Sequence, residues 1–98
     1  MPAIVLGELR YGFQGAAKAV ENEAKLDQFL RHPAVRVVSV GEPASRCYAH
    51  LKRFLRMQGS PIPENDIWIA ALALEHATPL LTSDVHFDHL PQVTRVVE

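Results

Sequence analysis

The sequence holds a single cysteine, Cys47, and has no long apolar run, and each shortage excludes a class of protein. One thiol cannot form a disulfide within the chain, so a disulfide framework is excluded and a reducing compartment is expected. A membrane-spanning helix needs about 20 consecutive apolar residues, and no stretch approaches that length. Glu8 soon interrupts the apolar opening, which does not resemble a signal peptide. We therefore expect a cytoplasmic protein with no membrane partner.

The chain also lacks an excess of charge of either sign. Its formal net charge is −1, so contact with nucleic acid would need a local basic patch. The sequence contains no repeats, no glycine-rich phosphate loop and no Ser-His-Asp arrangement. Its 98 residues are 48% hydrophobic and 21% charged, which is typical of one globular domain. We expect residues 1–98 to form a single domain.

Apolar periodicity and breaker residues divide the chain into helices and short strands. Four helices are predicted, over about Pro2–Phe13, Ala16–Arg31, Glu42–Gly59 and Glu64–His76. The three predicted strands are the apolar runs "VRVVSV" (35–40), "LLTSD" (80–84) and "TRVVE" (94–98). Strands that alternate with helices indicate an α/β fold with a mostly parallel sheet. Sites in such sheets form at the carboxyl ends of the strands, where Asp84 lies.

Three acids are the candidate site residues. Glu8 shares a face with apolar residues of the first helix, Asp66 stands in a helix's first turn, and Asp84 ends a strand. Each has a structural explanation: Glu8 could reach water, Asp66 could favour the helix dipole, and Asp84 could be a turn residue. Glu64 or Asn65 could cap the fourth helix. Together, however, the three carboxylates suit magnesium or manganese, which take oxygen ligands from carboxylates and from a phosphodiester.

Three motifs of this chain resemble a known family. They are "ELRYG" (8–12), "ENDIWIAALAL" (64–74) and "LLTSDVHFDHLP" (80–91), and their order and spacing are similar to those of PIN-domain ribonucleases of the VapC toxin type. The resemblance implies a three-layer α/β/α sandwich with a mostly parallel sheet. It also implies Mg²⁺- or Mn²⁺-dependent hydrolysis of RNA, a homodimer or higher oligomer, and inhibition by a cognate antitoxin. By motif, Glu8, Asp66 and Asp84 correspond to the metal-binding acids, with Asn65 beside the metal.

The family's first motif, a hydrophobic strand that carries an aspartate ahead of the "ELRYG" helix, has no counterpart in the sequence. We therefore expect a PIN-like domain that is truncated at its amino end and lacks one strand and one metal ligand. Unpaired sheet edges would favour dimerisation or exchange of an element between protomers. Two functions remain open. One is a metal-dependent endoribonuclease, and the other is an inactive PIN-like module that binds an antitoxin or a full-length copy.

The turn "DVHFDH" (84–89) offers a competing metal site. His86, Asp88 and His89 lie close to Asp84 in sequence, and imidazole suits zinc or nickel. The spacing matches no established zinc pattern, so a transition-metal site is the less favoured interpretation. We expect Phe87 to anchor the turn, and Asp88 is the best candidate for a further acid near the site.

The third helix carries the basic patch of the chain. Arg46, His50 and Arg53 recur at i, i+4 and i+7, so that Arg46 and Arg53 could contact RNA phosphates. A solvated helix face is the favoured alternative, because most charge runs are solvated. Tyr11 and Trp68 could stack on RNA bases, but both stand at positions compatible with packing, which we favour.

Overall fold

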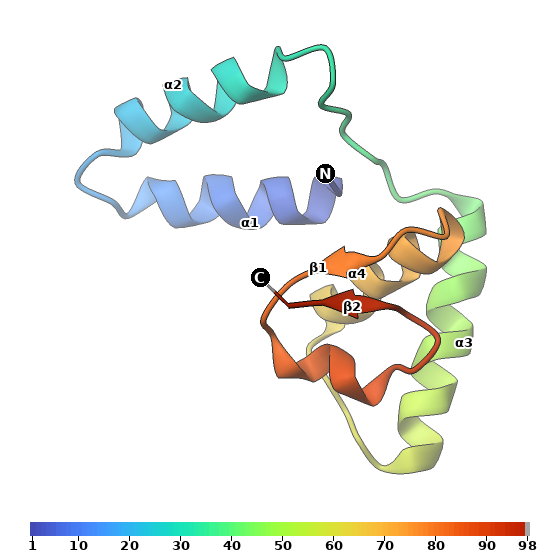
Figure 1. Cartoon of the computed structure of the whole chain (residues 1–98). Coiled ribbons are helices and arrows are strands. Elements are labelled where there is room, and N and C mark those ends of the chain that lie inside the picture. The colour runs from blue at the N-terminus through green and yellow to red at the C-terminus, as the bar shows by residue number, and fades with distance from the viewer. Residues whose placement is uncertain (98) are drawn as a thin grey trace. The chain divides into compact units, whose positions relative to one another are not determined.

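The computed structural model describes residues 1–97, and Glu98 lies outside the described residues. The chain divides into two compact units, Met1–Ser39 and Val40–Glu98, which are described in turn (Figure 1). None of the helices in the described part is both long and apolar enough to cross a membrane. The expectation that residues 1–98 form a single domain stays a prediction.

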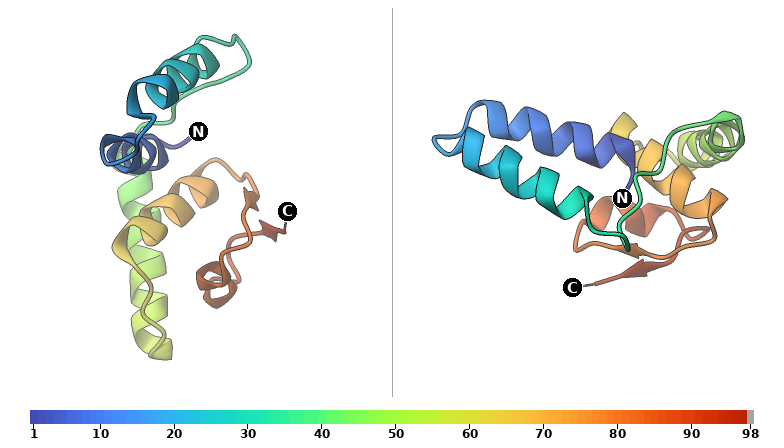
Figure 2. Two further views of the ribbon diagram at one scale, coloured as in Figure 1. Left: turned by 90° about the vertical axis from the view of Figure 1, so that its left-hand side faces the viewer. Right: turned by 90° about the horizontal axis from the view of Figure 1, so that it is seen from above.

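The first unit is a helical hairpin of α1 (Ala3–Gln14) and α2 (Ala19–Leu30), which run side by side (Figures 1 and 2). Both predicted helices are confirmed, although α2 begins later than predicted because residues 15–18 form a turn. Arg10 of α1 joins the helices by ion pairs to Glu23 and, at 3.2 Å, to Asp27 of α2. Ion pairs therefore connect the two helices of the hairpin.

The apolar pattern of α2 predicts that Leu26, Phe29 and Leu30 face inward and that Glu21 pairs with Lys25 on the outside. The pair of Glu21 and Lys25 is present at 3.2 Å. Leu26 is buried, as the pattern predicts, but Phe29 is 50% exposed, so the prediction is wrong for Phe29.

The segment predicted as a first strand, residues 35–40, forms a single parallel bridge between Pro2 and Val38. The Ala3 amide donates to the Val38 carbonyl at 2.8 Å, and the Val38 amide donates to the Met1 carbonyl at 2.8 Å. Within the described chain these residues form no longer ladder, so the strand prediction is wrong except at this bridge. Valine-rich sequence favours a strand only where a neighbouring strand pairs with it.

The second unit begins with α3 (Glu42–Gln58), which packs against α4 (Glu64–Glu75). Pro43 lies in the first turn of α3, where its missing N–H costs no hydrogen bond. The helix ends at Gly59, whose φ of 68° is left-handed and therefore suits glycine. Both ends of α3 agree with the prediction.

The interior of the second unit is built around α4, which is apolar on most sides and buried accordingly. Leu51 and Leu55 of α3 are almost completely buried against it. Phe87 is 5% exposed, so its predicted role as the anchor of the turn is confirmed. The other buried apolar side chains of this interior include Ile67, Ile69, Leu72, Leu90 and Val93.

The cap predicted for α4 is wrong. Pro63, not Glu64 or Asn65, is the capping residue, and no side chain bonds to the helix start. Pro63 has extended backbone angles and ends a rigid turn, so Glu64 is already inside the helix. The carboxylate of Glu64 instead contacts Lys52 at 2.7 Å and accepts a hydrogen bond from the hydroxyl of Tyr48, which joins α4 to α3.

The remaining elements are β1 (Leu80–Leu81), the 3-10 helix η1 (Val85–His89) and β2 (Arg95–Val96). The strands pair in parallel, Leu80 with Arg95 and Leu81 with Val96, which confirms the predicted parallel sheet. Both strands are shorter than predicted, and the last residue of "TRVVE" lies outside the described residues. Asp84 follows β1 at its carboxyl end, as the sequence indicated.

Candidate metal centre

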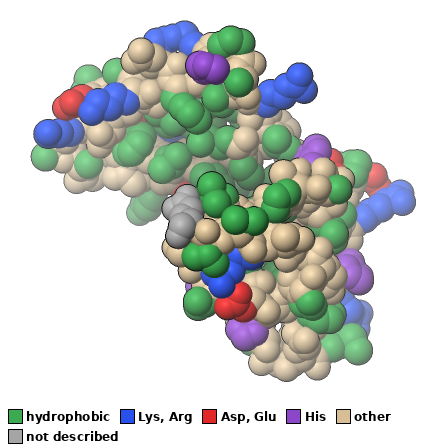
Figure 3. All heavy atoms as spheres, viewed as in Figure 1, with side chains coloured by type: hydrophobic (Ala, Val, Ile, Leu, Met, Phe, Trp, Pro, Cys, Tyr) green, Lys and Arg blue, Asp and Glu red, His purple; other side chains and the backbone are tan. Residues whose placement is uncertain are grey.

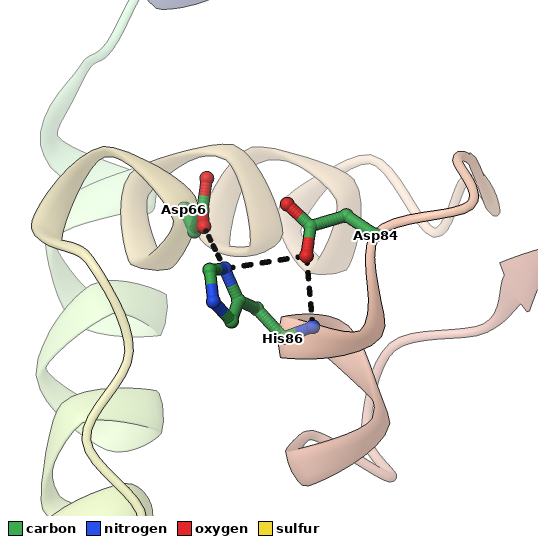
Figure 4. A group of neighbouring side chains, drawn as sticks. All are labelled: Asp66, Asp84 and His86. Atoms are coloured by element: carbon green, nitrogen blue, oxygen red, sulfur yellow. Dashed lines mark hydrogen bonds and ion pairs between the residues drawn. The ribbon is translucent and has the colours of Figure 1, made fainter.

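Asp66 is held by the first turn of α4. Its amide donates to the carbonyl of Pro63 at 3.0 Å, and its side chain is 16% exposed. Because α4 is anchored by its buried residues, the carboxylate is carried on a rigid support. The carboxylate points toward His86 of η1 (Figure 4).

Asp84 is held by three contacts of the loop after β1. Its amide donates to the hydroxyl of Thr82 at 3.1 Å, and its Oδ1 accepts the amide of His86 at 2.9 Å, which caps η1. Arg95 of β2 donates from Nη1 to the Asp84 carbonyl at 3.1 Å. The side chain is 41% exposed, so a ligand can approach it from solvent.

His86 lies between the two carboxylates. Its Nδ1 is 2.9 Å from Asp66 Oδ2 and 3.2 Å from Asp84 Oδ1 (Figure 4). One ligand atom from each of the three residues lies within 4.8 Å of the others. α4, the end of β1 and η1 thus bring together an Asp66–Asp84–His86 cluster. The two carboxylates of this cluster suit a hard divalent cation such as Mg²⁺ or Mn²⁺, and the imidazole suits a transition-metal ion.

Within the second unit the structure brings together two of the acids predicted from sequence, Asp66 and Asp84. Asp88 does not join Asp66 and Asp84, because it forms an ion pair with Arg95 Nη2 at 2.9 Å. Asn65 is exposed next to Asp66. Glu8 is an exposed residue of α1 in the first unit, and its assignment to the site stays a prediction.

Sequence reasoning missed the positions of His86 and Arg95. It grouped His86 with Asp84, Asp88 and His89; the structure places His86 beside Asp84, as that grouping predicted, but also beside Asp66, twenty residues earlier. A signal for the contact of His86 with Asp84 existed in its spacing, because the backbone N–H of the second residue after a capping aspartate bonds to that carboxylate. Arg95, which tethers the Asp84 carbonyl, stood in a strand-like run with nothing to mark it.

The basic residues considered for RNA contact lie on the surface of α3, in the second unit. Arg46 forms an i,i+4 ion pair with Glu42 at 2.7 Å and is 81% exposed, and Arg53 is exposed. Figure 3 shows basic and histidine side chains along the edge formed by α3. This exposure is compatible with both a solvated face and a phosphate-binding face.

The two aromatic residues considered for base stacking differ. Trp68 stacks on Tyr48, with ring centroids 3.9 Å apart and planes at 12°, so its predicted packing role is confirmed. Tyr11 is 79% exposed, and its predicted packing role is wrong. Beside the stacked pair, the Lys52 ammonium followed by the Tyr48 hydroxyl lowers the pKa of Glu64, and hydrogen bonding to Glu64 raises the pKa of Lys52.

The three sequence motifs, the α/β fold and the Asp66–Asp84–His86 cluster together indicate the class of protein to which the chain belongs. The model of the PIN domain matches residues 1–93, and the chain belongs to the PIN-domain family. This membership and the relatives below confirm the resemblance to VapC-type PIN domains.

Among its relatives, the chain is 30% identical over 92 residues to ribonuclease VapC2 of Rickettsia felis, covering 93% of this chain and 67% of that protein. It is 31% identical over 90 residues to ribonuclease VapC4 of Mycobacterium tuberculosis, covering 92% and 69%. The chain thus spans about two thirds of the length of these relatives.

Solved structures of similar fold support the α/β assignment. One is VapBC2 from Rickettsia felis bound to a DNA fragment from its promoter, with a TM-score of 0.88, 29% identity, and coverage of 98% of this chain and 71% of that chain. Another is VapBC-5 from Mycobacterium tuberculosis, with a TM-score of 0.78, 31% identity, and coverage of 97% and 79%. The predicted α/β fold with a parallel sheet is confirmed.

Proposed function

We propose that this chain is a VapC-type toxin ribonuclease of a toxin–antitoxin system, which hydrolyses phosphodiester bonds of RNA with the help of Mg²⁺ or Mn²⁺. The observation that carries the proposal is the convergence of Asp66 and Asp84 in a PIN-domain chain. These two acids come from motifs separated in sequence, and they meet at the carboxyl end of a parallel strand, where α/β proteins bind their ligands.

The side chains divide the work as follows. Asp66 and Asp84 would hold the cation, and Glu8 would complete the ligand set or orient the attacking water. A bound divalent cation supplies neutralisation of phosphate charge and activation of water for attack on phosphorus. Water forms the new P–O bond, and the bond to the leaving oxygen of the RNA breaks. Arg95 would act as a positioning residue, because it holds the Asp84 backbone rather than the substrate.

The partners of this activity belong to the same proposal. RNA is the substrate, with Arg46 and Arg53 of α3 as candidate phosphate contacts and Asn65 as a polar group next to Asp66. A cognate antitoxin is supported by relatives solved as VapBC complexes. We further propose a homodimer or higher oligomer in the cytoplasm, as expected for the family.

A second candidate function is an inactive PIN-like module that binds an antitoxin or a full-length copy. It is favoured by the small number of acids, because the described cluster holds two carboxylates and a histidine. Recovery of an antitoxin together with an absence of cleavage would favour this candidate.

The test is cleavage of a mixed RNA pool by the purified chain, with Mn²⁺ and with a chelator. Loss of a residue that only hydrogen-bonds to a metal ligand typically lowers activity by about 10- to 100-fold. Asp66→Asn and Asp84→Asn remove proposed ligands themselves, so each should reduce cleavage by more than that. Asp27→Asn is the matched control, since Asp27 is an exposed ion-pair partner of Arg10 in the other unit. Unchanged cleavage in both site variants would overturn the assignment of the site.

A further inference from the structure

His86 is the one member of the cluster whose contribution the family motifs did not assign, and its ring nitrogen is placed where a ligand would be. Nδ1 is 2.9 Å from Asp66 Oδ2 and 3.2 Å from Asp84 Oδ1 (Figure 4). Adjacent ligands at right angles around a cation with bonds of about 2.1 Å are separated by about 3.0 Å. Both measured separations agree with that value.

The backbone of His86 is fixed by the structure around it. The backbone amide of His86 is held by Asp84 Oδ1 at 2.9 Å, and the next residue, Phe87, is buried in the core. The ring therefore needs no new backbone conformation to remain beside the two carboxylates. A ligand that is held in place before binding loses little conformational entropy when the cation arrives.

The other residues of the turn do not share this geometry. Asp88 is engaged by Arg95 at 2.9 Å, and His89 is exposed. Among the described residues, the His, Cys, Asp and Glu side chains that group closely enough to hold a cation are Asp66, Asp84 and His86. A mixed site with one nitrogen donor, rather than a cluster of acids alone, is what the fold presents.

We propose that His86 Nδ1 is a direct ligand of the cation held by Asp66 and Asp84, and that this nitrogen makes the site prefer Mn²⁺ to Mg²⁺. The inference rests on the proposed metal site and names its third donor. Mg²⁺ is bound mainly through oxygen and keeps its waters, whereas transition-metal ions, which include Mn²⁺, accept imidazole nitrogen more readily.

The experiment measures Mn²⁺ binding to the full 98-residue chain without RNA. Pulsed electron paramagnetic resonance of the bound Mn²⁺ detects the coupling of a directly bonded imidazole nitrogen. We expect this coupling in the unaltered chain and in His89→Gln, and its loss in His86→Gln. His86→Gln should also weaken Mn²⁺ binding by about 10- to 100-fold. His89→Gln is the matched control, because it removes an exposed imidazole from the same 3-10 helix.

A second variant, His86→Asp, tests the inference through the preference of the site for Mn²⁺ or Mg²⁺. His86→Asp replaces the nitrogen by oxygen, so competition between Mn²⁺ and Mg²⁺ should shift toward Mg²⁺ by about tenfold or more. Circular dichroism confirms that each variant is folded. No nitrogen coupling in the unaltered chain, or coupling that persists in His86→Gln, would overturn the role of His86.

The outcomes also separate this inference from the proposed function. If RNA cleavage needs Mn²⁺ and Asp66 while His86→Gln binds Mn²⁺ normally, the ribonuclease proposal stands and the ligand role of His86 fails. If the folded chain binds no Mn²⁺ and cleaves no RNA, both fail. Nitrogen coupling that depends on His86 in a chain without cleavage supports the ligand role and favours the inactive module.

Discussion

Glu64 and Asp66 lie two residues apart at the start of α4, yet they meet opposite surroundings. Glu64 faces α3, where Lys52 at 2.7 Å and the Tyr48 hydroxyl balance its charge. Asp66 faces η1, where it meets His86 and, beyond it, the carboxylate of Asp84. In the described chain Asp66 has no Lys or Arg partner. Glu64 is therefore balanced by a lysine of the protein, whereas Asp66 lies beside His86 and a second carboxylate, as the proposed cation site requires.

The comparison explains why a buried helix begins with "END". The apolar side chains of α4 pack against α3 and η1, which holds the first turn of the helix in place. The carboxylates of Glu64 and Asp66 point in different directions from this turn. Under the proposed function, Glu64, which joins two helices, has a structural role, and Asp66 has a functional one. The predictions below test this division, from the largest expected effect to the smallest.

The largest difference should separate Asp66→Asn from Glu64→Gln. We expect RNA cleavage and Mn²⁺ binding to fall more than about 100-fold in Asp66→Asn, because the variant loses a charged ligand. Glu64→Gln should keep both within about threefold, since its exposed ion pair contributes little. Single-turnover cleavage and Mn²⁺ titration measure the two effects. Equal losses in the two variants would contradict the division between a structural and a functional acid.

Arg95 should have the next largest effect on activity. Its guanidinium tethers the Asp84 carbonyl and pairs with Asp88, so Arg95→Met frees the loop that carries Asp84. We expect cleavage to fall by about 10- to 100-fold, as for other residues that orient metal ligands. Mn²⁺ affinity of Arg95→Met is measured at a temperature where circular dichroism shows that the variant is folded. A loss of affinity under these conditions reports misplacement of Asp84 and not unfolding. An unchanged affinity would mean that Asp84 is held without Arg95.

Asp88→Asn sharpens the reading of the Arg95 result. It removes the ion pair but leaves the hydrogen bond from Arg95 to the Asp84 carbonyl, so cleavage should change less than in Arg95→Met. A loss as large as that of Asp66→Asn would instead support the sequence-based prediction that Asp88 is a further site acid.

The stacked pair on the structural side of α4 should affect stability rather than activity. Trp68→Leu and Tyr48→Leu each remove the stacking, whose coupling in a double-mutant cycle should be about 0.5–1.5 kcal/mol. Urea unfolding of the unaltered chain, the two single variants and the double variant measures this coupling. Mn²⁺ affinity of the folded variants should stay unchanged, and a parallel loss of affinity would show that the two sides of α4 are coupled.

The smallest effect concerns pH. The folded-state pKa of Glu64 is lowered from its ordinary 4.5, so its contribution to stability is fully present above 4.5 and is lost as pH falls through the lower value. The pKa of Lys52 is raised from 10.5, so its contribution is present below 10.5 and is lost as pH rises through the higher value. The difference in thermal midpoint between the unaltered chain and Glu64→Gln should therefore be constant near neutral pH and shrink at both extremes. Because both groups are exposed, the shift is small.

Much of the fold was readable because local signals agreed with tertiary packing. Pro43 and Gly59 mark the ends of α3, and the apolar run after "END" predicted a helix buried on most sides. The parallel pairing of β1 with β2 followed from strands alternating with helices. The segment 35–40 failed because a strand depends on a neighbour that the sequence of the segment does not specify.

The site was readable to the extent that it follows motifs. Asp66 and Asp84 were found because a helix start and a strand end are local features. The contacts of His86 with Asp66 and of Arg95 with the Asp84 carbonyl were not predicted, because they join elements that are distant in sequence. The cap of α4 was assigned to Glu64 or Asn65 from residue type, whereas Pro63 had already set the backbone that begins the helix.

The Asp84 oxygen that caps η1 has a consequence for any study of this loop. The same atom, Oδ1, accepts the His86 amide at 2.9 Å and lies 3.2 Å from the His86 ring. Alanine at this position would therefore erase charge and loop geometry together, and the two losses could not be told apart. Asparagine keeps an acceptor oxygen for the amide and removes the charge alone, so at position 84 the choice of replacement decides what the experiment measures.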